Sequence, residues 1–113
     1  IMTPFEHCYL DLYQGDPAVE PNTYSMLRLR DCYKFSIVPD SIDASFVLGG
    51  QGNLWAESIP HYRQVEYMTW PRAMAISETL WNETDSRNWD FFIQRVEKSG
   101  LLFQLVYYGS HCP

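Results

Sequence analysis

A short apolar run that ends in glycines is the feature that most constrains this chain. Residues 46–48 are Phe-Val-Leu, and the segment 49–57 that follows reads GGQGNLWAE. An apolar run of this length predicts a buried strand, and Gly49 and Gly50 allow another group to approach the backbone closely. Side chains alternate in an extended chain, so Trp55 and Glu57 are expected on the same side.

An indole and a carboxylate on one side of a segment are typical of a sugar site. The ring of Trp55 offers an apolar platform for a pyranose face, and an ionised Glu57 accepts hydrogen bonds from hydroxyl groups. The alternative is structural, because large aromatic residues are usually buried for packing. Trp55 is then a core residue, and Glu57 is a solvated charge near the start of a helix.

The beginning of the chain carries a second pair of this kind. Residues 1–3 and 7–12 read as strand material on either side of Pro4. Apolar positions at 8, 10 and 12 alternate with Tyr9, Asp11 and Tyr13, which predicts one apolar face and one face that carries the chemistry. The alternative for Tyr9 is an aromatic residue that packs over a neighbouring strand.

The second half of the chain has helical spacing. Apolar residues recur after Pro60 and again after Pro71, which predicts a break near residues 69–70 and a new helix over 71–81. Asp85 or Ser86 is expected to cap the next helix, and Gly100 to end it. The apolar face of that helix consists of Trp89, Phe92, Ile93 and Val96. The run 101–108 has the length of a strand but can equally be an irregular tail.

Composition excludes several classes of protein. The formal net charge of −6 argues against nucleic-acid partners, and no apolar stretch is long enough for a membrane span. With 46% hydrophobic residues, the chain is expected to be globular. We expect buried free thiols at Cys8, Cys32 and Cys112, and no metal site, because histidine and cysteine pairs at positions 7–8 and 111–112 lack the spacing of a zinc site.

Three blocks of sequence then combine into a family pattern. They read HCYLDLYQGDP at 7–17, GGQGNLWAE at 49–57 and WPRAMAISETLW at 70–81. In this order they resemble the C-terminal part of the catalytic domain of family-20 glycoside hydrolases, the beta-N-acetylhexosaminidases. The resemblance extends from residue 1 to about residue 81, and it continues more weakly to the end.

The resemblance implies an α/β fold, namely the C-terminal strand–helix units of a (β/α)8 TIM barrel, incomplete in this chain. Residues 1–81 are expected to form the last two barrel units, and residues 82–113 a terminal helix and tail. It also supports a short helix over 27–33. Catalytic groups of such barrels lie at the C-terminal ends of the strands, where the two residue pairs are expected.

The resemblance further implies substrate-assisted, retaining hydrolysis of terminal N-acetylglucosamine or N-acetylgalactosamine from glycans, without a cofactor or metal. Tyr9 would hold the acetamido group of the substrate. Asp11 and Glu57 would bind the outer hydroxyls, and Trp55 would wall the pocket. The sequence leaves the localisation open, and we expect the full-length protein to be exported, as a periplasmic, secreted or lysosomal protein. Arg72 and Glu78 are interpreted as structural, as charge-pair residues that pin the last barrel helix to the barrel.

The adjacent Asp-Glu pair that supplies the general acid in this family does not occur in the 113 residues. We therefore expect this chain alone to be inactive. The alternative function is a non-catalytic carbohydrate-binding or interaction module. Cutting a barrel opens strand edges, so self-association through residues 1–12 or 46–50 is expected unless the tail, 101–108, covers an edge.

Overall fold

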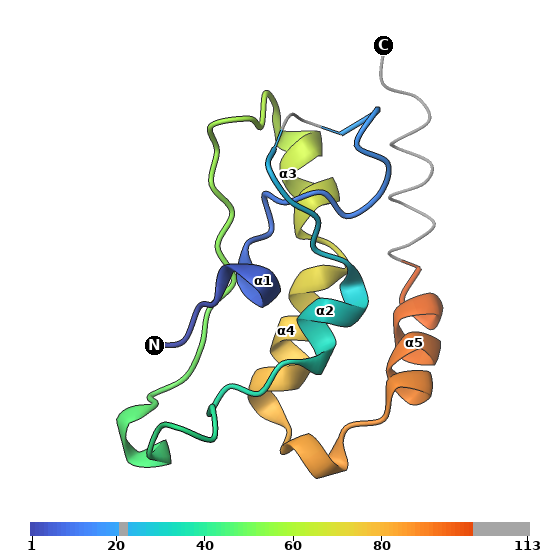
Figure 1. The fold of residues 1–113 in the computed structure, drawn as a ribbon. Coiled ribbons are helices and arrows are strands. Elements are labelled where there is room, and N and C mark those ends of the chain that lie inside the picture. The colour runs from blue at the N-terminus through green and yellow to red at the C-terminus, as the bar shows by residue number, and fades with distance from the viewer. Residues whose placement is uncertain (21–22, 101–113) are drawn as a thin grey trace.

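Helices dominate the structure, a computed structural model that describes residues 1–20 and 23–100 (Figure 1). The elements are α1 (Phe5–Cys8), α2 (Leu29–Lys34), the 3-10 turn η1 (Ala44–Phe46), α3 (Tyr62–Thr69), α4 (Arg72–Trp81), the 3-10 turn η2 (Thr84–Ser86) and α5 (Trp89–Lys98). Helices α2 and α4 pack side by side in the centre, and α5 lies along one side. None of the described helices is both long and apolar enough to span a membrane.

The expected strands are reduced to isolated parallel bridges in the described residues. Met2 pairs with Gly50, and Tyr9 pairs with Asn53. A third bridge joins Tyr13 to Met26. Residues 7 and 8 were expected in a strand, but they belong to the helical turn α1. The two bridges are separated by more residues in the N-terminal segment (2 to 9) than in the facing segment (50 to 53), and the helical turn accommodates the extra residues. The barrel arrangement of these segments stays a prediction.

Two glycines of the 49–57 segment are required by close packing. A Cβ atom at Gly50 would lie 3.0 Å from the carbonyl oxygen of Met2 and 2.8 Å from the Leu80 side chain. At Gly52 it would lie 3.1 Å from the Ile76 side chain. Gly49 has open space around it but a φ of 145°, which side chains of L-residues rarely adopt. The expected close approach is therefore confirmed at Gly50, whereas Gly49 serves backbone conformation.

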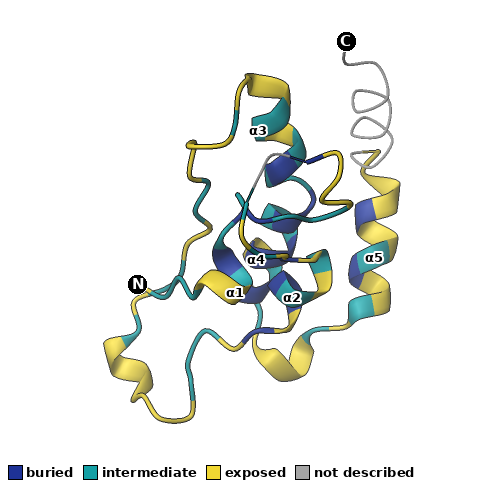
Figure 2. Cartoon of the chain, turned by 45° about the horizontal axis from the view of Figure 1, so that its top comes forward, coloured by how far each residue is buried: buried dark blue, intermediate teal, exposed yellow. Residues whose placement is uncertain are grey.

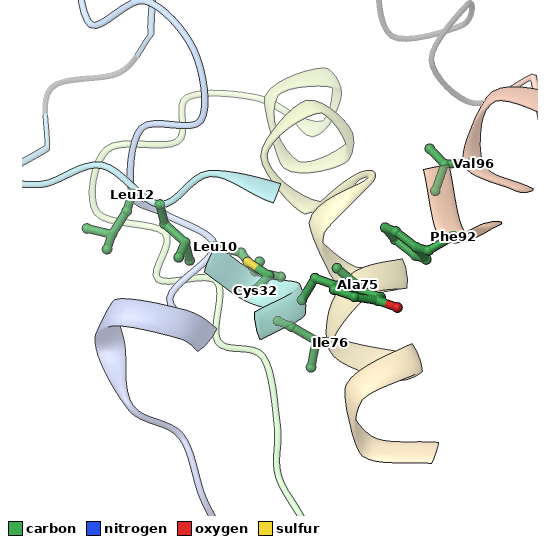
Figure 3. Packing of buried hydrophobic residues seen from close by; sticks show 9 residues of the cluster. Leu10, Leu12, Cys32, Ala75, Ile76, Phe92 and Val96 are labelled. Carbon is green, nitrogen blue, oxygen red and sulfur yellow. The ribbon is translucent and has the colours of Figure 1, made fainter. Parts of the chain in front are cut away.

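The core joins the N-terminal segment to α2, α4 and α5 (Figure 3). Its buried members are Leu10, Leu12, Leu27, Cys32, Tyr33, Ala75, Ile76, Phe92 and Val96. The alternation predicted for residues 8–13 is confirmed, since 8, 10 and 12 are buried while 9, 11 and 13 are only partly covered. The predicted face of α5 is also confirmed, with Trp89 and Ile93 packed against the same core.

The predicted helix boundaries agree with the structure except at one cap. The chain breaks between α3 and α4, where the Trp70–Pro71 peptide bond is cis, and α2 lies close to the predicted 27–33. Helix α5, however, is capped by Asn88, whose side chain accepts a 3.0 Å hydrogen bond from Phe91 N–H. The prediction of Asp85 or Ser86 as the cap is wrong, because these two residues belong to η2.

The prediction of a buried strand at residues 46–48 is wrong. Phe46 is 79% exposed and Leu48 is 85% exposed, and the surrounding segment is largely exposed (Figure 2). Asp43 accepts a 2.8 Å hydrogen bond from Ser45 N–H, which starts the turn η1 and bends the chain away from an extended path. These exposed apolar side chains support the self-association expected for this segment, which remains a prediction.

Arg72 is fully buried, and it joins the N-terminal segment, the residues just before α2, and α3. Its Nη1 atom donates hydrogen bonds to the carbonyl oxygens of Leu12 (2.8 Å) and Leu27 (3.0 Å). Its Nη2 atom donates to those of Leu10 (2.5 Å) and Met68 (2.5 Å). These four bonds offset the cost of burying the cation, although its Nε atom has no hydrogen-bond partner in the described residues.

These contacts correct the expectation that Arg72 and Glu78 act as charge-pair residues that pin the helix. Arg72 does pin the helix, but it does so through carbonyl oxygens. Glu78 instead forms an ion pair with Arg95 of α5. The physical reason is helical spacing, because residues six apart point in different directions, whereas Glu78 faces the neighbouring helix.

The two arginines provide a matched test of this bonding. We expect Arg72→Met to lower the free energy of unfolding by about 3 to 5 kcal/mol, since it leaves four buried carbonyl groups without a donor. Arg95→Met should cost at most about 1 kcal/mol, because the pair with Glu78 is partly exposed. Urea unfolding of both variants measures the difference, and equal losses would contradict the assigned role of Arg72.

Candidate functional site

Parallel pairing explains why residues from distant parts of the sequence meet in one place. Leu10 N–H donates to the Asn53 carbonyl at 2.7 Å, and Asn53 N–H donates to the Cys8 carbonyl at 2.8 Å. Both segments leave this bridge in the same direction. Asp11 and Trp55 each follow two residues after the bridged Tyr9 and Asn53, so they emerge at the same end.

A pocket of about 510 Å³ lies at this end of the bridge. It is lined by Asp11, Thr23, Tyr24, Trp55, Glu57 and Ser58. Three residues singled out in the sequence, Asp11, Trp55 and Glu57, are thereby brought together. The fourth, Tyr9, lies outside the lining, but its ring packs edge-on against Trp55, with 5.9 Å between centroids. The indole of Trp55 is 48% exposed, so it is a pocket wall more than a core residue.

The carboxylate of Asp11 is partly buried, and its hydrogen bonding is incomplete. Within residues 1–20 and 23–100, no group donates a hydrogen bond to its buried Oδ1 atom. Burial raises the pKa of Asp11, and the charge of Glu57 acts in the same direction. The backbone N–H groups of Asp11 and Trp55 and the cation of Arg72 oppose this rise. The Oδ1 atom is closed to solvent, so its missing hydrogen bond is a cost of the fold, whereas Asp11 as a residue lines the pocket and is only partly covered.

The backbone around Asp11 is fixed from inside the protein. Arg72 binds the carbonyl oxygens of Leu10 and Leu12, the residues on either side of Asp11. Those two side chains are buried in the core, so the chain between them has little freedom to move. The position of the pocket carboxylate therefore depends on α4, which contributes no residue to the pocket lining.

The buried carboxylate of Glu20 fixes the loop that follows the site segment. Glu20 accepts hydrogen bonds from Gln14 N–H (2.8 Å) and Gly15 N–H (2.6 Å). It also accepts one from the Tyr67 hydroxyl of α3 (2.7 Å), and burial together with this contact raises the pKa of Tyr67 to about 12. The sequence shows only turn residues here, and nothing in it marks Glu20 as buried.

Sequence reasoning missed half of the pocket lining. Thr23, Tyr24 and Ser58 were assigned no role, because they lie in segments without periodicity and near turn residues. Ser58 directly follows Glu57, but Thr23 and Tyr24 lie well beyond Asp11, after the turn residues at 14–17 and 20–22. Hydroxyl groups are common on any surface, so their type alone marks no site.

The cysteines behave as predicted where the structure describes them. Cys8 and Cys32 are free and buried, and burial raises their pKa values to about 11 and about 12. Cys112 and His111 lie outside the described residues, as does the run 101–108. No group of histidine, cysteine, aspartate or glutamate residues in the described part of the chain is suited to hold a metal ion.

Comparison with known proteins identifies one family, both from a sequence model and from individual relatives. Residues 1–84 match the sequence model of the catalytic domain of glycosyl hydrolase family 20. The beta-hexosaminidase of Porphyromonas gingivalis is 32% identical over 118 residues, an alignment that covers 100% of this chain and 15% of that protein.

Solved structures show the same similarity. The crystal structure of a beta-N-acetylhexosaminidase superposes with a TM-score of 0.77 at 27% identity, covering 88% of this chain and 22% of the other. The exo beta-N-acetylglucosaminidase of Vibrio harveyi, solved in complex with N-acetylglucosamine, gives a TM-score of 0.73 at 30% identity. It covers 91% of this chain and 17% of that one, so this chain spans a small part of its relatives.

The raised pKa of Asp11 predicts a stability effect with a definite sign. Its folded pKa exceeds the unfolded value of 3.8, so the ionised carboxylate destabilises the fold at neutral pH. We expect Asp11→Asn to stabilise the protein at pH 7 and to lose this advantage as the pH falls through the folded pKa and below 3.8. Urea unfolding at several pH values measures it.

Asp43 is the matched control for this measurement. Its hydrogen bonds with Ser45, first the one from the backbone N–H, lower its pKa below 3.8. Asp43→Asn should therefore destabilise the protein at pH 7, which is the opposite sign. A loss of stability for Asp11→Asn at pH 7 would contradict this prediction, because it would show that the ionised carboxylate makes net favourable contacts in the folded protein.

Proposed function

The chain belongs to glycosyl hydrolase family 20, and on this premise we propose that it forms part of the sugar pocket of an exo-acting beta-N-acetylhexosaminidase. The observation that carries the proposal is the joint position of Asp11, Trp55 and Glu57 around one pocket, with Tyr9 against Trp55. The proposed substrates are glycans that end in N-acetylglucosamine or N-acetylgalactosamine. Because the chain spans only 15% of the Porphyromonas gingivalis relative, the activity is proposed for the full-length protein.

The proposed place of the chain in that protein is the C-terminal end of a TIM barrel. Residues 1–81 would supply the last two strand–helix units, and residues 82–113 the terminal helix and tail. Three observations support this assignment: the parallel direction of all three bridges, the match to the family's catalytic domain, and the similarity to solved members. In a complete barrel, neighbouring segments would extend the isolated bridges into strands.

The proposed reaction uses the substrate's own acetamido group. Its oxygen attacks the anomeric carbon, the glycosidic bond breaks, and a general acid outside residues 1–113 protonates the leaving oxygen. Tyr9 would donate a hydrogen bond to the acetamido oxygen and hold it in line for attack. A phenol is suited to this task, since its O–H group is a hydrogen-bond donor.

The pocket residues would bind the rest of the sugar. Carboxylates only accept hydrogen bonds when ionised, so Asp11 and Glu57 would bind hydroxyl protons. The position of both residues in the lining of one pocket supports this role. The exposed part of the Trp55 indole would cover an apolar face of the sugar ring.

Hydrolysis of 4-nitrophenyl N-acetyl-β-glucosaminide tests the proposal directly. The full-length protein should release nitrophenol, and residues 1–113 alone should not, because they contain no Asp-Glu pair. An inactive full-length protein that still binds N-acetylglucosamine would instead favour the carbohydrate-binding module. Turnover by residues 1–113 that survives repurification would contradict the assigned absence of the acid.

Two substitutions in the full-length protein separate the roles of Tyr9 and Glu57. We expect Tyr9→Phe to lower kcat about a hundredfold with little change in KM, as for other positioned donors. Glu57→Gln should mainly raise KM. Tyr33→Phe is the control, because that hydroxyl is buried in the core and has no hydrogen-bond partner in the described residues. An unchanged kcat with a raised KM for Tyr9→Phe would make Tyr9 a binding residue only.

A further inference from the structure

Tyr24 is an exposed aromatic residue that the proposed reaction leaves without a role. It lines the pocket together with Asp11, Trp55 and Glu57, and it is 71% exposed. The side chain therefore contributes little to the core. Exposed aromatic residues at the edge of a polar pocket are typical of ligand contacts, because they offer a large surface that needs little ordering.

The backbone around Tyr24 is held in place on both sides. Thr23 N–H donates a 3.1 Å hydrogen bond to the Tyr13 hydroxyl oxygen. Tyr13 N–H in turn donates to the Ser25 carbonyl at 3.0 Å, and Leu27 N–H donates to the Tyr13 carbonyl at 2.7 Å. Residues 23 and 25 are thus both bonded to Tyr13, which follows Asp11 closely in the sequence. The loop presents Tyr24 at a fixed position relative to Asp11.

The surroundings of the phenol keep it protonated. Loss of water around the hydroxyl raises the pKa of Tyr24, and the charges of Asp11, Tyr9 and Glu57 raise it further. Tyr24 also lines the same pocket as the carboxylates of Asp11 and Glu57. A protonated phenol can donate a hydrogen bond, which neither ionised carboxylate can do.

A sugar hydroxyl has one proton to donate and lone pairs that accept. Asp11 and Glu57 can bind only the proton, so the oxygen of a bound hydroxyl still needs a donor. The pocket also contains the hydroxyls of Thr23 and Ser58, which sit on short side chains, whereas Tyr24 carries its hydroxyl at the end of a long, 71% exposed side chain. With a donor and an acceptor around one hydroxyl, binding of the sugar would depend on whether that hydroxyl is present and on the direction in which it points from the ring.

We propose that Tyr24 is a specificity-determining residue of this pocket, whose phenol donates a hydrogen bond to the oxygen of the outer sugar hydroxyl that Asp11 or Glu57 binds through its proton. This inference rests on the proposed hexosaminidase function and adds a residue that recognises the sugar. It predicts discrimination against sugars that lack this hydroxyl. A site built to bond a hydroxyl rejects the analogue without it, because its polar groups are then left unpaired.

The test compares substrates with and without each candidate hydroxyl in the full-length protein. The substrates are 4-nitrophenyl N-acetyl-β-glucosaminide and its 4-deoxy and 6-deoxy analogues, which lack hydroxyls far from the anomeric carbon. Tyr24→Phe should lower kcat/KM for the parent substrate about tenfold, the range of one neutral hydrogen bond. For one of the two deoxy analogues, it should have almost no effect, because the bond is already missing.

Tyr62 provides the matched control. It is 72% exposed, lies on α3 and does not line the pocket. Tyr62→Phe should leave kcat/KM unchanged for all three substrates. Because both tyrosines are exposed, neither substitution should shift the urea midpoint, which checks that the Tyr24 effect is local.

The outcomes distinguish this inference from the function on which it rests. If the wild-type protein hydrolyses the parent substrate and Tyr24→Phe matches it, only the role of Tyr24 is overturned. An equal loss on all three substrates also overturns it, since the phenol would then act without a specific hydroxyl. If the wild-type protein hydrolyses none of them, the proposed function and this inference fall together.

Discussion

The buried guanidinium of Arg72 is the contact on which the rest of the structure depends. It satisfies four carbonyl oxygens, those of Leu10, Leu12, Leu27 and Met68, which come from segments far apart in the sequence. Helical and sheet hydrogen bonds cannot do this here, because the described segments pair only through isolated bridges. The planar guanidinium, which has several donors, takes the place of a ladder of sheet hydrogen bonds and connects the segments at one point.

The same contact links stability to the pocket. Arg72 fixes the peptide groups on both sides of Asp11, and its charge opposes the burial that raises the pKa of that carboxyl. The fold therefore holds a partly buried carboxylate with a raised pKa in the lining of an open pocket. Proteins retain such unfavourable groups mainly at functional sites, where the cost is recovered when a ligand binds. The proposed sugar hydroxyls are ligands of the required kind.

The elements that could be predicted from the sequence are those whose signals are local. The alternation at residues 8–13, the break before Pro71 and the apolar face of α5 depend on spacing and on the chemistry of single residues, and the structure confirms them. Predictions failed where distant contacts decide. Phe46 and Leu48 are apolar but exposed, because the described residues contain nothing that covers them, and Arg72 looked like an ion-pair residue because its carbonyl partners leave no mark in the sequence.

The sequence by itself determined the family, through three blocks in a fixed order, and it identified Asp11, Trp55 and Glu57 as candidates by their residue types and two-residue spacing. Only the tertiary structure decided that they share one pocket, and that Tyr9 contacts Trp55 from outside its lining. It also added Tyr24, Thr23 and Ser58. The physical reason is that spacing fixes which way neighbouring side chains point, whereas parallel pairing and the bonds of Arg72 fix which distant segments meet.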